Sequence, residues 1–289
     1  MMDYAALSAL AEIIRRGSFE AAAAALGVTP SAVSQRIKGL EERLGQVLIH
    51  RGPPATGTET GLRLMQHLDQ VRLLESTLAA SLRPAGGPAV LRLAVNADSL
   101  ATWFLPVLTA LPLLYDLVVD DQDHARDWLR QGQVSGAISS EPVPVPGCDA
   151  IALGNMRYLA LATPDFIARY FPDGVTEASL RTAPAIIFNA KDALQSRWVQ
   201  LATGRRLHVP GHLIPASEPF ARAVELGLGW GMIPETMAEL ALRAGRMQPL
   251  RPDLPLDVPL YWHVQRAMAP ALAPLTAEIR KRAAADLRP

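Results

Sequence analysis

Residues 18–45 constrain the fold more than any other segment, because they predict two short helices joined by a tight turn. Ser18 is a preferred N-cap residue for the first helix, and Gly27 is typical of a helix C-terminal end. Thr29 caps the second helix, and Pro30 occupies its first position, where the missing N–H costs nothing. Two such helices with three residues between them predict a helix-turn-helix, a motif that can bind DNA.

The residues after this motif predict a wing. Residues 47–50 have the composition of a short strand, 51–54 that of a turn, and 55–58 can return as a second strand. We therefore expect residues 1–60 to form a winged helix-turn-helix domain.

A long helix is expected next, over residues 59–83, with Thr58 as its cap. Its apolar residues recur every three or four positions, at Leu62, Met65, Leu68, Val71, Leu74 and Leu78. A helix of this length with one apolar seam usually pairs with a copy of itself, so it predicts a linker that forms a homodimer. Residues 84–89 are rich in proline and glycine and predict a hinge.

From residue 90 onward, short apolar strands alternate with amphipathic helices. Strands are expected over 91–95, 117–119, 136–139, 158–162, 185–188, 212–214, 230–233 and 260–264, and helices over 219–226, 235–244 and 273–287. This alternation indicates an α/β domain with a mostly parallel sheet. About 200 residues suffice for two lobes around a cleft: lobe I over about 90–161 and 266–289, and lobe II over about 162–265.

Composition restricts the partners of such a chain. The 289 residues carry no net charge, with 28 basic and 28 acidic side chains, which argues against a polybasic coat but allows a local basic reading head. No apolar run reaches the roughly 18–20 residues of a membrane span, and no secretion signal is evident at the N-terminus. The single cysteine, Cys148, excludes an intramolecular disulfide. We expect a cytoplasmic protein.

Several segments resemble the LysR family of transcriptional regulators. Residues 18–45 read SFEAAAAALGVTPSAVSQRIKGLEERLG, and residues 48–51 and 58–61 read LIHR and TETG. The resemblance implies a C-terminal two-lobed α/β effector domain like the periplasmic binding proteins. It also implies a double-stranded DNA operator, a small-molecule effector, contact with RNA polymerase, and a homodimer or homotetramer.

A narrower resemblance lies in the second half. Residues 94–103 read AVNADSLATW, 170–175 read YFPDGV and 260–263 read LYWH, which is similar to the ArgP/LysG subgroup. That subgroup responds to lysine or arginine and controls basic amino-acid export. The likeness fades around 190–209.

The predicted DNA-binding surface is the polar side of the second motif helix. Val33, Ile37, Leu40 and Leu44 recur on its apolar side and Gly45 ends it. The predicted DNA-binding residues are Thr29, Pro30, Ser31, Ser34, Gln35, Arg36, Lys38 and Arg51. We expect Gln35 to reach a base edge, and the cations to hold phosphates. Taken singly, Ser31 and Ser34 are more often ordinary helix-surface residues; within the whole motif, the DNA-binding role is favoured.

The predicted effector site must satisfy one carboxylate and two cations of a basic amino acid. Its candidates are Asn96, Asp98, Ser99, Thr102, Asp120, Asp121, Ser217 and Glu218. The aspartates follow predicted strand ends, where ligands bind in open α/β sheets. The hydroxyls stand at helix starts, which favour an anion. Two alternatives remain open: Asp98 simply caps its helix, and Glu218 only stabilises the start of its helix through the helix dipole.

Three other functions are alternatives to a ligand-gated regulator. A solute-binding protein of the same fold would lack the helix-turn-helix. An enzyme with an appended DNA-binding domain would need a catalytic constellation, and no nucleophile elbow, phosphate loop or zinc spacing is visible. An architectural DNA-binding protein would need no effector. The sequence therefore predicts no catalytic residues, no metal and no cofactor other than the effector.

Overall fold

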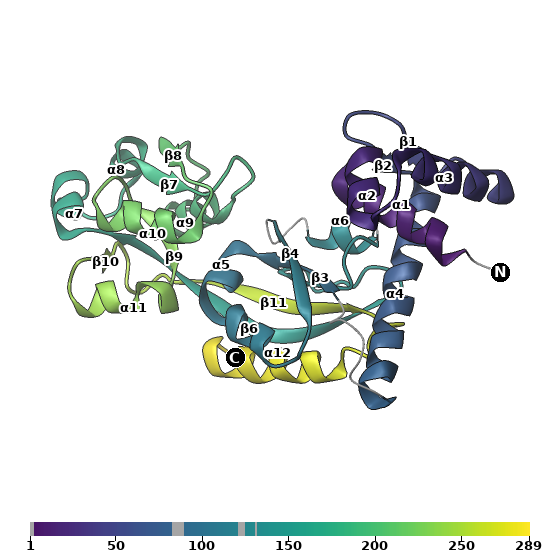
Figure 1. Ribbon diagram of the computed structural model, residues 1–289. Helices are drawn as coiled ribbons and strands as arrows, with labels where there is room; N and C mark the ends of the chain where they lie inside the picture. The colour runs from purple at the N-terminus through teal and green to yellow at the C-terminus, as the bar shows by residue number, and fades with distance from the viewer. Residues whose placement is uncertain (1–2, 83–89, 121–124, 131) are drawn as a thin grey trace.

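The computed structural model describes residues 3–82, 90–120, 125–130 and 132–289. A small helical head, a long helix and an elongated body of two lobes follow one another along the chain (Figure 1). The head contains α1 (Tyr4–Arg16), α2 (Phe19–Leu26), α3 (Pro30–Leu44), β1 (Ile49–His50) and β2 (Thr56–Gly57), and it leads into α4 (Glu59–Leu82).

The predicted helix boundaries of the head are confirmed by its caps. The hydroxyl of Ser18 accepts a hydrogen bond from the Ala21 N–H at 3.1 Å, and that of Thr29 accepts one from Ala32 at 3.2 Å. Glycines 27 and 45 both adopt a left-handed conformation with φ of 64°, which side chains other than glycine disfavour.

The sequence predicts that the apolar residues of α4 face a second copy of the chain, but they do not all do so, because some of them pack inside the head. Met65 and Leu68 are buried in the core of the head, and Leu62 packs against that core. This part of the seam therefore serves its own chain, because α1 and the wing already cover it. Leu74 is half exposed, and the side chain of Leu78 lies outside the described residues.

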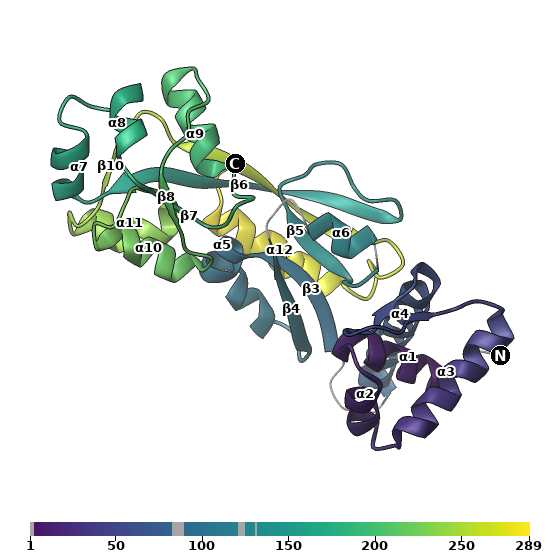
Figure 2. The same cartoon turned by 90° about the horizontal axis from the view of Figure 1, so that it is seen from above.

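The second half folds as predicted into alternating strands and helices (Figure 2). Its strands are β3 (Val90–Asn96), β4 (Leu114–Asp120), β5 (Gly136–Ser139), β6 (Cys148–Ala162), β7 (Ala185–Ile187), β8 (Gly211–Leu213), β9 (Gly231–Pro234), β10 (Gln248–Pro249) and β11 (Leu256–Gln265). Its helical elements are α5 (Ala97–Ser99), η1 (Leu100–Phe104), η2 (Leu105–Thr109), α6 (Ala125–Arg130), α7 (Pro164–Tyr170), α8 (Glu177–Thr182), α9 (Leu194–Thr203), α10 (Ser217–Glu225), α11 (Glu235–Arg243) and α12 (Ala273–Asp286).

The expectation of a mostly parallel sheet is wrong. The main sheet has the order β10-β6-β11-β5-β3-β4, with β9 also paired to β6. Strand β3 pairs in parallel with β4 and β5, and the other described pairs of this sheet are antiparallel. The reason is that the chain crosses between the lobes twice in opposite directions. The two crossing strands, β6 and β11, pair with each other and are therefore antiparallel.

The lobes are built on either side of these crossing strands. One lobe contains β3, β4, β5, α5 and α12, and the other contains β7, β8 and helices α7 to α11 (Figure 1). A separate apolar cluster around Ile186, Phe220, Val224 and Ile233 lies in the second lobe, beside the part of the main core that contains Trp198 and Trp230. We call these lobe I and lobe II. The predicted hinge at 84–89 lies outside the described residues.

Candidate functional site

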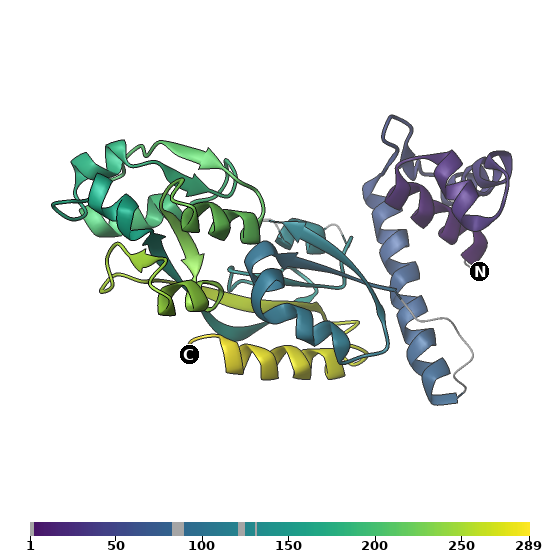
Figure 3. The ribbon, with the colours of Figure 1, turned by 60° about the vertical axis from the view of Figure 1, so that its left-hand side comes forward.

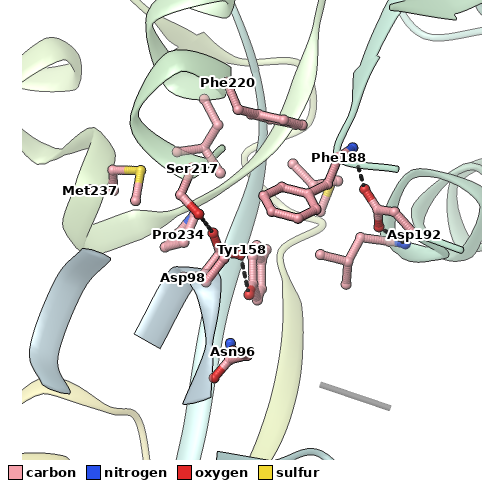
Figure 4. Close-up of a pocket in the computed structure, with 13 residues that line it drawn as sticks. Asn96, Asp98, Tyr158, Phe188, Asp192, Ser217, Phe220, Pro234 and Met237 are labelled. Atoms are coloured by element: carbon pink, nitrogen blue, oxygen red, sulfur yellow. Dashed lines mark hydrogen bonds between the residues drawn. The ribbon is translucent and has the colours of Figure 1, made fainter. Parts of the chain in front are cut away.

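A cavity of about 60 Å³ opens where β6 passes between the two lobes. Its wall contains Asn96, Ala97, Asp98, Tyr158, Phe188, Asp192, Leu194, Ser217, Phe220, Met232, Ile233, Pro234 and Met237. The residues come from the carboxyl end of β3 and from α5, from β6 and β9, and from the loop after β7 and the first turns of helices in lobe II (Figure 4). This is the place that the sequence predicted for a ligand, beyond the strand ends of an α/β domain.

Asp98 is the polar centre of this cavity. Its carboxylate accepts a hydrogen bond of 2.8 Å from the Tyr158 hydroxyl, and one of 2.7 Å from the Ser217 hydroxyl (Figure 4). Tyr158 belongs to a crossing strand and Ser217 begins α10 in lobe II. The Asp98 carboxylate of lobe I is therefore hydrogen-bonded both to crossing strand β6 and to helix α10 of lobe II.

Asp192 supplies a second carboxylate, from the loop between β7 and α9 of lobe II. One of its oxygens accepts from the Phe188 N–H at 3.0 Å, and the other from the Leu194 N–H at 2.9 Å. These bonds fix the loop and the side chain against the cavity. Sequence reasoning missed Asp192, although the rule applied to Asp98 would have found it, since it also follows a strand that ends at the cleft.

The remaining predicted effector residues have different surroundings. Asn96 lines the cavity, is 5% exposed, and its side-chain oxygen has no hydrogen-bond partner among the described atoms. The hydroxyl of Ser99 is fully buried and accepts from the Trp103 indole at 3.1 Å, while that of Thr102 donates to the Asp98 carbonyl. Neither hydroxyl lines the cavity, since both are used within their own helical segment.

Glu218 also lies outside the cavity wall and is exposed. The backbone of Asp120 pairs with Asn96 at the carboxyl ends of β4 and β3. The side chain of Asp120 and the whole of Asp121 lie outside the described residues. Asn96, Asp98 and Ser217 are thus the predicted residues that the fold brings together at this cavity.

The charge of the cavity wall is one-sided. Two carboxylates, Asp98 and Asp192, face it from opposite lobes, and no lysine, arginine or histidine occurs among its described lining residues. An environment of this kind favours a ligand with positive charge, because charges taken from water need partners of opposite sign.

The other predicted surface lies on α3 of the head. Ser31, Gln35 and Lys38 are exposed on one side of this helix, opposite the buried Val33 and Ile37. Thr29 and Pro30 are exposed at its start, and Ser34 and Arg36 are half-buried. Their spacing places polar groups along one helix face, as an α-helix in a major groove requires.

The wing arginine is positioned by the head itself. The Arg51 guanidinium lies 3.6 Å from a carboxylate oxygen of Glu41 and 5.5 Å from the centre of the Phe19 ring. Its side chain remains 58% exposed. The other oxygen of Glu41 accepts a 2.8 Å hydrogen bond from the Leu48 N–H, so α3 and the wing are joined at this residue.

The head and the body touch through α4 (Figure 3). The side-chain amide of Gln70 donates a 2.9 Å hydrogen bond to Gln265, the last residue of β11. Within the described part of the chain, no group of three or more His, Cys, Asp or Glu side chains could hold a metal ion, and no helix is long and apolar enough to cross a membrane.

Comparison with known proteins agrees with both halves of this structure. Residues 4–62 match the bacterial regulatory helix-turn-helix proteins of the LysR family, and residues 85–284 match the LysR substrate binding domain. The transcriptional regulator ArgP of Pseudomonas fluorescens is 45% identical over 300 residues, covering 100% of this chain and 99% of the relative. The lysine export regulatory protein LysG of Corynebacterium glutamicum is 40% identical, covering 98% of each chain.

Solved structures give the same result. The crystal structure of ArgP from Mycobacterium tuberculosis superimposes with a TM-score of 0.86 at 42% identity, covering 100% of this chain and 99% of the other. Full-length LysG from Corynebacterium glutamicum with bound arginine gives 0.75 at 39% identity, covering 100% of both. These relatives are named as regulators of transcription, not as enzymes. The chain therefore belongs to the LysR family of transcriptional regulators, with a DNA-binding head and an effector-binding domain.

Proposed function

We propose that the cavity between the lobes binds a basic amino acid, L-arginine or L-lysine, and that its occupancy controls how the head binds DNA. The observation that carries this proposal is the pair of carboxylates, Asp98 and Asp192, in a wall whose described residues include no basic side chain. A basic amino acid offers two cations at opposite ends, which matches acceptors on opposite lobes.

The α-carboxylate of such a ligand would be held at the start of α10. Ser217 lines the cavity there, and no side chain caps this helix. The first N–H groups of a helix and its dipole favour an anion. The unpartnered oxygen of Asn96 would accept from an ammonium group.

The relatives support the same effector class. LysG of Corynebacterium glutamicum has been solved with bound arginine and carries lysine export in its name. On this basis we propose that the protein controls a gene for basic amino-acid export or related metabolism. A LysR-type regulator with a different effector is the second candidate, because the likeness of the sequence fades over 190–209, the segment that contains Asp192.

We further propose that the exposed face of α3 reads the operator. Ser31, Ser34 and Gln35 would contact base edges, and Arg36, Lys38 and Arg51 would contact phosphates, with the N–H groups after Thr29 and Pro30 close to the backbone. The regulator would act in the cytoplasm as a homodimer or homotetramer. Effector binding would alter the lobe arrangement, and hence DNA bending and contact with RNA polymerase.

Titration of the purified protein tests the effector. Arginine or lysine should raise the melting temperature, while citrulline, which has the shape of arginine without its distal charge, should have little effect. Asp98→Asn and Asp192→Asn should each weaken arginine binding at least tenfold, since a hydrogen bond to a charged group is worth about 1.5–3 kcal/mol. Asp173→Asn changes an exposed aspartate away from the cavity and is the matched control.

Two outcomes would overturn the proposal. One is the lack of any thermal shift with basic amino acids. The other is equal affinity for arginine and citrulline, which would show that the carboxylates do not select a cation.

A further inference from the structure

The segment that follows α12 lies against the middle of crossing strand β6. The Asn155 N–H donates to the Arg288 carbonyl at 2.7 Å, and the Arg288 N–H donates to the Asn155 carbonyl at 2.9 Å. The Asn155 side-chain amide also donates to the Pro289 carbonyl at 2.8 Å. Residues 287–289, which we call the clasp, thus form a short antiparallel bridge with β6.

A glycine makes this close approach possible. Gly154 has φ of 122°, and a Cβ at this position would lie 2.6 Å from the Arg288 carbonyl oxygen. The register of β6 against β11 shifts here, between Leu260 and Tyr261. The clasp therefore contacts β6 at an irregular point, where strands bend.

The side chain of Arg288 continues from this bridge into lobe II. Its guanidinium lies 2.7 Å from the carboxylate of Glu235, the first residue of α11. The residue before Glu235 is Pro234, which lines the cavity. Since α12 belongs to lobe I, the clasp links the two lobes behind the cavity wall.

A second ion pair reinforces the same region. Arg157 of β6 makes two hydrogen bonds of 2.8 Å to Asp257 of β11. These bonds, with a smaller contribution from the charge of Arg288, hold the pKa of Asp257 below its usual value. Two arginines and two acids thus gather where the crossing strands leave lobe I.

We propose that Arg288 is a positioning residue: the clasp holds the lobes in the arrangement that brings Asp98 and Ser217 together, and so it sets effector affinity without touching the effector. This inference rests on the proposed function of the cavity. The apparent dissociation constant of a ligand rises as the fraction of protein in the binding-competent arrangement falls. Loosening the clasp should therefore weaken binding, although every cavity residue is retained.

Arg288→Met, Glu235→Gln and the double variant test the linkage by calorimetric titration with arginine. The ion pair is partly exposed, so each single change should raise the dissociation constant about two- to fivefold. The double variant should be no weaker than the singles, because both changes break one contact. Arg251→Met breaks the pair with Asp253 inside lobe II and should leave the affinity unchanged. Additive losses, or an equal loss in the control, would overturn the proposal.

Hydrogen exchange tests the clasp without an effector. In ligand-free protein, Arg288→Met should speed amide exchange in a peptide covering 148–162, with the melting temperature nearly unchanged, and Arg251→Met should not. If wild-type protein binds no basic amino acid, the proposed function fails and this measurement alone decides the clasp. Unchanged exchange in Arg288→Met would overturn it, whatever the effector is.

Discussion

The hydroxyl of Ser217 donates a 2.7 Å hydrogen bond to the carboxylate of Asp98, and this bond joins lobe II to lobe I across the cavity between them. The two residues are 119 positions apart in the sequence. Since Ser217 is also the first residue of α10, any movement of that helix changes the surroundings of the Asp98 carboxylate. Lobe arrangement and cavity chemistry are thereby coupled through one contact.

Removing this hydroxyl should loosen the lobes. Ser217→Ala should lower the free energy of unfolding by about 1–2 kcal/mol, because Ser217 is 8% exposed and its partner is a carboxylate. Urea denaturation measures the change. As a control, Ser196→Ala removes an exposed hydroxyl from α9 and should lower the free energy of unfolding by no more than a small fraction of the change expected for Ser217→Ala. Equal stability of the two variants would show that the interlobe bond contributes nothing.

Gln35 should determine which base is preferred at one position of the operator. It is exposed on the polar side of α3, so Gln35→Ala should relax preference at one operator position by about 1–3 kcal/mol. Binding to a panel of single-base operator variants measures this. Lys38→Ala, expected to lose a phosphate contact, should instead weaken all variants alike. A uniform loss for Gln35→Ala would contradict base reading.

Arg51 should hold the DNA backbone. Its guanidinium is kept in place by Glu41 and Phe19 but remains exposed, so Arg51→Ala should weaken binding to all sequences. The slope of log affinity against log salt should fall by about one. Arg222→Ala removes the same charge far from the head and is the control. An unchanged slope for Arg51→Ala would exclude a phosphate contact.

Two glycines of the head should respond oppositely to alanine. A Cβ on Gly61 would lie 2.1 Å from the Leu48 carbonyl, so Gly61→Ala must push α4 away from the wing and should cost about 1–3 kcal/mol. Gly39 lies within α3 with nothing within 4 Å of such an atom, so Gly39→Ala should stabilise by about 0.5–1 kcal/mol. Thermal unfolding compares them. Similar effects of both would refute the close approach.

The local signals of the head were sufficient to predict its structure. The hydroxyls of Ser18 and Thr29 each accept a hydrogen bond from the N–H three residues later. Such a cap is formed within four consecutive residues, so a local sequence pattern is enough to predict it. The same holds for the glycines that end those helices. The tertiary contacts were needed to show that Met65 and Leu68 of α4 pack on the head. The spacing of apolar residues along a helix predicts that one side is buried, but not which surface buries it.

In the effector-binding domain, too, some features follow from the local sequence and others depend on tertiary contacts. Local patterns in the sequence predicted that strands alternate with helices and that Asn96 and Asp98 lie at a strand end, because side-chain periodicity and strand ends are local properties. Tertiary contacts were needed to show that β6 and β11 cross together as antiparallel neighbours, that Asp98 meets Ser217, and that Asp192 lines the same cavity. Those relations depend on distances between residues remote in the chain, which no local pattern records.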